Sequence, residues 1–135
     1  LVVVAGPTVE RTCDTPIPAV VRGQVGQAQA WDVATSTGKV RVPVDPILGL
    51  SSMVMVRDAV RAGVGVAQLP LSLVSHDLSV GTLMHWGDVD GPETALWALY
   101  PSRRLLSARV SAFLGYLKEC FPHGTPGELA AYVSA

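Results

Sequence analysis

The stretch Ile47–Pro70 constrains the fold more than any other part of the sequence. Its four opening residues are an apolar run that predicts a strand. A helix is expected next, because Ser51 and Ser52 offer N-cap hydroxyls and Gly63 stands where a C-terminal glycine belongs. Apolar residues recur at helical spacing between these ends: Met53, Val56, Ala59 and Val60. Val64–Leu69 then resembles a strand buried on both faces of a parallel sheet. We therefore predict a βαβ unit and an α/β fold.

The sequence before this unit predicts a strand and a hairpin. Leu1–Ala5 is a β-branched run typical of a buried strand. Trp31–Val44 predicts a hairpin in which valines alternate with polar residues, and Pro43 confines its second strand to an edge or a bulge. Residues 8–29 are interrupted by prolines and glycines, so they are expected to form a loop with at most one helical turn.

The sequence after the unit predicts two helices and two strands. Leu71–Asp77 favours a short helix, whereas Leu83–Trp86 and Thr94–Tyr100 favour strands. Ser107 is a suitable N-cap for a final helix, whose apolar stripe runs to Phe121.

Composition indicates one folded domain that does not bind nucleic acid by itself. The 135 residues suffice for a single core. With 49% hydrophobic and 16% charged residues, the chain is too apolar to be disordered. The formal charge of -1 cannot supply the positive field that phosphate binding requires.

Cysteines and the N-terminal sequence favour a cytoplasmic protein. Cys13 and Cys120 are far apart and outside any metal-ligand spacing, so they are interpreted as reduced thiols. The apolar N-terminus lacks the basic flank and length of a signal peptide, and no apolar run approaches the roughly 20 residues of a membrane span. The chain is expected to be part of a longer protein.

Four segments, in this order, resemble the effector-binding domain of LysR-type transcriptional regulators. The first is Ser51–Pro70, with its Ala-Gly-Val-Gly-Val-Ala-Gln-Leu-Pro ending. The others are Leu71–Leu83, Leu96–Arg104 and Val110–Leu117. Ser51 stands where many members of the family carry asparagine.

The resemblance implies a lobe of the type 2 periplasmic-binding-protein-like fold, a mixed sheet with flanking helices, within an incomplete two-lobe domain. Residues 1–121 would form a partial effector-binding domain. Within it, residues 1–89 would be the second lobe, and residues 94–121 the returning strand and helix of the first. Residues 122–135 are expected to be a C-terminal tail.

The turn before the predicted helix is the main candidate for effector binding. The first amides of a helix lack intrahelical partners, and the helix dipole favours an anion there. Ser51 and Ser52 would add hydroxyl donors to a small carboxylate or aromatic acid, with Leu50 and Met53 as apolar walls. The alternative is that both serines only cap the helix.

Trp31 and Gln68 are further candidates for the effector site. Trp31 could line the pocket, although a tryptophan that opens a hairpin also suits a core. Gln68 is a polar residue in an apolar strand; it could face the cleft or be a hydrogen-bonded buried amide.

Neither catalysis nor a metal or other cofactor is predicted. The histidines His76, His85 and His123 are scattered, and no nucleophile–base pair or paired carboxylates are evident.

The resemblance also implies partners. These are a small-molecule effector and a second copy of the chain, in a homodimer or higher oligomer that could form through the Ser107–Phe121 helix. DNA would be bound only by an N-terminal domain outside this sequence, and no membrane is involved. Two alternatives remain open: a solute-binding protein of the same architecture, and a module that only dimerises.

Overall fold

The computed structural model describes residues 1–12, 15–91, 107–125, 127–128 and 131. Six strands are described: β1 (Val2–Ala5), β2 (Ile17–Arg22), β3 (Gln29–Thr35), β4 (Gly38–Leu50), β5 (Val66–Leu69) and β6 (Met84–Val89). The helices are α1 (Met53–Arg61), α2 (Leu71–Val80) and α3 (Ala108–Cys120).

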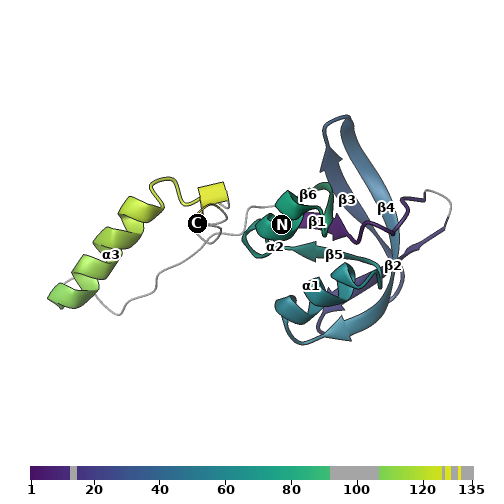
Figure 1. Ribbon diagram of the computed structural model, residues 1–135, viewed down its shortest axis with the longest axis horizontal. Helices are drawn as coiled ribbons and strands as arrows, with labels where there is room; N and C mark the ends of the chain where they lie inside the picture. Colours follow the sequence, from purple (N-terminus) through teal and green to yellow (C-terminus); the bar gives the residue numbers. More distant parts are fainter. Residues whose placement is uncertain (13–14, 92–106, 126, 129–130, 132–135) are drawn as a thin grey trace.

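The six strands form one mixed sheet that closes on itself. Their order is β1-β5-β2-β4-β3-β6, and β6 pairs back onto β1. The β2 strand runs parallel to β4 and β5, whereas the other pairs are antiparallel. Figure 1 shows α1 and α2 beside this sheet. The predicted α/β class and mixed sheet are therefore confirmed.

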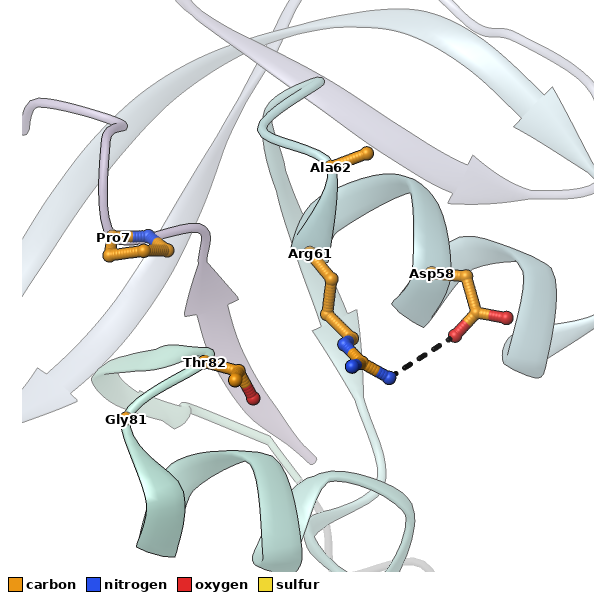
Figure 2. A pocket seen from close by; sticks show the side chains of 6 residues that line it. All are labelled: Pro7, Asp58, Arg61, Ala62, Gly81 and Thr82. Atoms are coloured by element: carbon orange, nitrogen blue, oxygen red, sulfur yellow. Dashed lines mark ion pairs between the residues drawn. The ribbon is translucent and has the colours of Figure 1, made fainter.

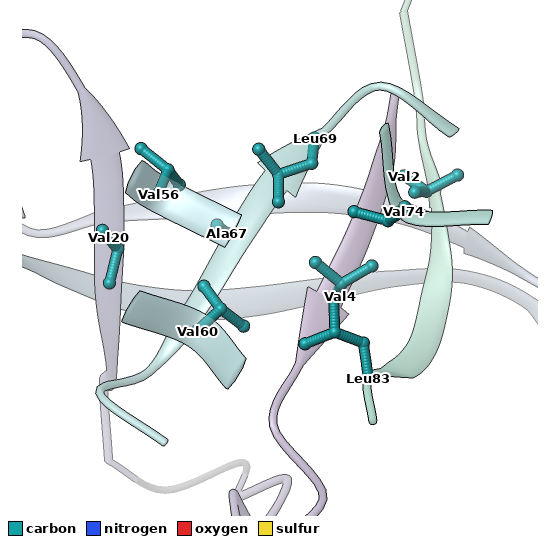
Figure 3. Close-up of a cluster of buried hydrophobic side chains, with 9 residues drawn as sticks. All are labelled: Val2, Val4, Val20, Val56, Val60, Ala67, Leu69, Val74 and Leu83. Carbon is teal, nitrogen blue, oxygen red and sulfur yellow. The ribbon is translucent and has the colours of Figure 1, made fainter. Parts of the chain in front are cut away.

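Alternating residues of the strands build two cores, because successive side chains of a strand point to opposite faces. One core lies between the sheet and the two helices α1 and α2, and Figure 3 shows its members: Val2, Val4, Val20, Val56, Val60, Ala67, Leu69, Val74 and Leu83. The other face of the sheet carries a second core: Val3, Ala5, Ile17, Ala19, Trp31, Val33, Val42, Val44 and Val66. Both faces of β1 are thus buried.

The βαβ prediction is confirmed in its essentials. The end of β4 leads into α1, which leads into β5, with β2 lying between the two strands. Val56 and Val60 face the core, as their spacing predicted. Gly63 follows the helix with φ +82°, a conformation that glycine adopts without steric cost.

The predicted hairpin is confirmed, but its second strand is longer than expected. Pro43 is the register partner of Ala30 in β3, and the pairing of β4 with β2 begins only at Val44. On the β2 side, Pro43 therefore has no partner that would need its missing N–H. The run before α1 is not a separate strand, because β4 continues to Leu50 through a register shift at Ile47.

The prediction of a loop with at most one helical turn at 8–29 is wrong, because β2 and the first residue of β3 lie within this range. Ile17, Ala19 and Val20 are buried between β4 and β5, and Pro18 is exposed. The proline stands next to the first residue of the strand, where a missing N–H is tolerated.

The final helix begins and ends as predicted. Ser107 caps α3, its hydroxyl accepting the Val110 N–H at 3.4 Å. No α3 residue is buried, and Figure 1 shows the helix apart from the sheet. The predicted strand Thr94–Tyr100 lies outside the described residues.

Candidate functional site

The turn between β4 and α1 is accessible. Ser51 is exposed, while Leu50, Ser52 and Met53 are half-buried. The Ser52 hydroxyl accepts the Val54 N–H at 3.3 Å, so this serine acts as the N-cap. Ser51 makes no such cap bond with a described residue, so its hydroxyl is available to a ligand.

The electrostatic character of this turn suits an anion. A helix N-terminus carries a partial positive charge, and the first turn of α1 contains no acidic residue to neutralise it. The Gly23 N–H donates to the Leu50 carbonyl at 2.8 Å, which ties the turn to the end of β2.

Arg22 is a residue that the sequence analysis missed. It is exposed and is the register partner of Leu50 across the β2–β4 pair. It makes no ion pair with a described residue, so a cation stands one strand away from the α1 N-terminus. Arg22 ends the mainly apolar run that begins at Ile17, and recognising this run as a strand would have identified it.

Gln68 lies at the same edge of the sheet as the turn, but Trp31 does not. The carboxyl ends of β4 and β5 point the same way, since both run parallel to β2. Gln68 is half-buried on β5. Trp31 is 8% exposed, pairs with Val42 and belongs to the second core. Gln68 therefore shares a sheet edge with the turn, although its neighbours Ala67 and Leu69 face the α1 core and its own side chain lies on the opposite face of the sheet.

Three cavities formed by described residues lie away from this turn. Figure 2 shows the first, of about 520 Å³, between Pro7, the end of α1 and the Gly81–Thr82 turn. The second, of about 500 Å³, lies between α1 and α2. The third, of about 630 Å³, lies beside the tip of the β3–β4 hairpin.

A buried carboxylate borders the second cavity. Asp77 is 5% exposed and accepts the Thr82 hydroxyl at 2.9 Å. Its carboxylate lies 3.3 Å from Arg61 Nε and 4.0 Å from Arg57 Nε. Since both arginines belong to α1 and Asp77 belongs to α2, these ion pairs hold the two helices together.

The described residues contain no group of three or more potential metal ligands. Within that same part of the chain, no helix is long and apolar enough to cross a membrane.

Comparison with known proteins identifies the family. The sequence matches the LysR substrate binding domain over residues 1–122, whereas a search of curated proteins gives no match. The regulatory domain of a cysteine-to-serine variant of AphB from Vibrio vulnificus is similar, with a TM-score of 0.55 and 16% identity over 87% of this chain and 64% of that one. CrgA, a LysR-type transcriptional regulator from Neisseria meningitidis, has a TM-score of 0.45 and 23% identity over 62% of this chain and 31% of that one.

This chain therefore spans less than two thirds of the length of these solved structures. The family match nevertheless covers nearly all of the sequence, and the mixed sheet with flanking helices agrees with the type 2 periplasmic-binding-protein-like fold. The chain belongs to the LysR substrate binding domain family and is a regulatory, effector-binding domain.

Proposed function

We propose that this domain senses a small carboxylate or aromatic acid at the turn formed by Leu50, Ser51, Ser52 and Met53. In the cell, binding would be relayed to a DNA-binding domain outside this sequence, in a cytoplasmic regulator without catalytic activity. Residues 1–89 would form the second lobe of the sensor.

The accessible N-terminus of α1 is the observation that supports this proposal. The Val54 N–H is accepted by the Ser52 hydroxyl. The other amides at the start of a helix have no intrahelical acceptor, and a carboxylate can accept their hydrogen bonds. Ser51 would add a hydroxyl donor, and Arg22 a positive charge from the neighbouring strand. Gln68 would contribute an amide from the same sheet edge.

The remaining parts of the chain complete the proposed sensor. Residues 94–121 would return to the first lobe and supply its last helix, and residues 122–135 would form the tail. Association into a homodimer or higher oligomer would use the helix at 107–121, where Phe113 is 59% exposed.

Titration with benzoate tests the proposed site, with benzamide as its uncharged counterpart. We expect benzoate to shift the NMR signals of the amides at 51–55 and benzamide to leave them unchanged. Binding should be weak, in the millimolar range, because a single lobe supplies only one wall of a two-lobe cleft.

Two arginine variants make this test specific. Arg22→Gln should weaken benzoate binding about tenfold, because it removes a charged donor. Arg41→Gln is the matched control, since Arg41 is exposed and pairs with Asp32 at 3.8 Å. Equal responses to benzoate and benzamide would refute an anion site at this turn.

A further inference from the structure

The cavity beside the β3–β4 hairpin has the composition of a second ligand site. Its walls come from three segments: Arg11 after β1, residues 34–37 with Val40 in the hairpin, and residues 85–88 of β6. It shares no residue with the turn at 50–53, so a ligand here would be distinct from the proposed effector.

Arg11 gives this cavity a positioned positive charge. Its guanidinium carbon lies 5.7 Å from the centroid of the Trp86 ring, within the range of a cation–π contact. The side chain makes no ion pair with a described residue. Because the indole contacts the guanidinium without using its N–H groups, these donors are available to a carboxylate.

The hairpin turn supplies hydroxyl groups. Thr35 Oγ1 donates to the Gly38 carbonyl at 2.7 Å and accepts the Thr37 N–H at 3.3 Å, which fixes the turn. Thr37 Oγ1 lies 3.0 Å from Thr35 Oγ1 and still has lone pairs to offer. Ser36 is exposed at the cavity wall, with no hydrogen bond from its hydroxyl to a described residue.

The hairpin and β6 are held together, so the cavity is formed before a ligand binds. Gly87 has φ +142°, and a Cβ atom there would come within 2.5 Å of the Ala34 carbonyl oxygen. Lys39 Nζ donates to Asp90 Oδ2 at 2.6 Å. This hydrogen bond raises the pKa of Lys39 above its ordinary value.

One acidic side chain, Asp88, lines the cavity among the described residues, and it lies 3.3 Å from His85 Nε2. A carboxylate in that position repels a bare anion but accepts hydrogen bonds from hydroxyl groups. We propose that the cavity binds a small polyhydroxylated carboxylate, whose acid group pairs with Arg11 and whose hydroxyls contact Asp88 and the hairpin.

Titration of the full 135-residue chain with gluconate tests this site by NMR. Sorbitol, which lacks the carboxylate, and hexanoate, which lacks the hydroxyls, are the matched probes. We expect gluconate to produce saturable shifts at Ser36, Thr37 and the Trp86 indole N–H. Sorbitol and hexanoate should bind about tenfold or more weakly, since each loses charged or neutral hydrogen bonds.

Variants separate this site from nonspecific binding. Arg11→Gln should weaken gluconate binding about tenfold, Ser36→Ala should weaken it less, and Arg41→Gln should not change it. The absence of saturable shifts, or unchanged binding by Arg11→Gln, would overturn the proposal. Shifts confined to 51–53 would also overturn it, and would place gluconate at the effector turn instead.

Discussion

At the scale of single residues, Asp77 is the one buried charged side chain among the residues that the structure describes. It is buried against Thr82 and lies close to two arginines of α1. A buried carboxylate without partners would be costly, so its hydrogen bond and ion pairs make its burial tolerable. The sequence placed Asp77 at the end of a short helix but did not indicate these partners, because Arg57 and Arg61 come from a different element.

Asp77→Asn should destabilise the domain by about 1–3 kcal/mol. The neutral amide can keep the hydrogen bond from Thr82 but loses the ion pairs. Their loss costs only a moderate free energy, because both arginines are partly exposed and solvent screens these pairs. Urea unfolding followed by circular dichroism measures this change. Asp58→Asn is the matched control, because the exposed Asp58 carboxylate also pairs with Arg57, at 2.9 Å. This variant should lower the free energy of unfolding by less than about 1 kcal/mol. Equal losses in the two variants would contradict the special role of burial.

At the scale of elements, close packing of β2 against the start of β5 determines how the parallel strands meet. A Cβ atom on Gly65 would come within 2.1 Å of the Pro18 carbonyl oxygen. The neighbouring residues Ala19 and Val66 form the β2–β5 pair. Glycine is therefore required at Gly65 because backbone atoms, which cannot move aside, occupy the space of a side chain.

Gly65→Ala should destabilise the domain by about 3 kcal/mol or more, since the clash forces β2 and β5 apart. Gly26→Ala is the control, because a Cβ there meets nothing within 4 Å; its effect should stay within about 1 kcal/mol. Thermal unfolding of both variants is the measurement. A stable Gly65→Ala protein with an unchanged amide NMR spectrum would show that β2 and β5 are not packed this closely.

Local signals made α1 predictable, whereas β2 depended on distant partners. The Ser52 cap, the spacing of Val56 and Val60, and Gly63 all lie within one short stretch of sequence. In contrast, β2 is held by β4 and β5, and its burial pattern does not alternate, so the sequence offers no local signal for this strand. The same contrast applies to the candidate site. The turn at 50–53 could be proposed from its own residues, whereas Arg22 could not, because its position beside the turn depends on the register between β2 and β4.

At the scale of the whole molecule, α3 presents exposed apolar side chains that belong to neither of the two cores formed by the described residues. Val110, Phe113 and Tyr116 are 38%, 59% and 50% exposed. Exposed apolar groups on one helix are typical of a surface that contacts another protein surface. This exposure is the basis for the proposed association of the chain through α3.

Phe113→Ser should weaken self-association, because it removes the most exposed apolar side chain of α3 from the proposed interface. Sedimentation equilibrium should show a dimer or higher oligomer for the unchanged chain and a shift toward monomer for the variant. Val80→Ser, which changes an apolar residue of α2 that is 57% exposed, should leave association unchanged. A chain that sediments as a monomer at micromolar concentration would contradict the proposal.

The closure of the sheet has a consequence for biosynthesis. Among the strands that the structure describes, β1 pairs with β5 and β6, which come last in the sequence. During translation, residues 2–5 leave the ribosome long before either neighbour exists. Their three valines and one alanine have no partner strand until β5 has emerged, and no second partner until residue 89 has emerged. Pairing across such sequence separations slows folding and prolongs the exposure of aggregation-prone segments. Nascent chains halted before β6 should therefore be the ones that depend on chaperones.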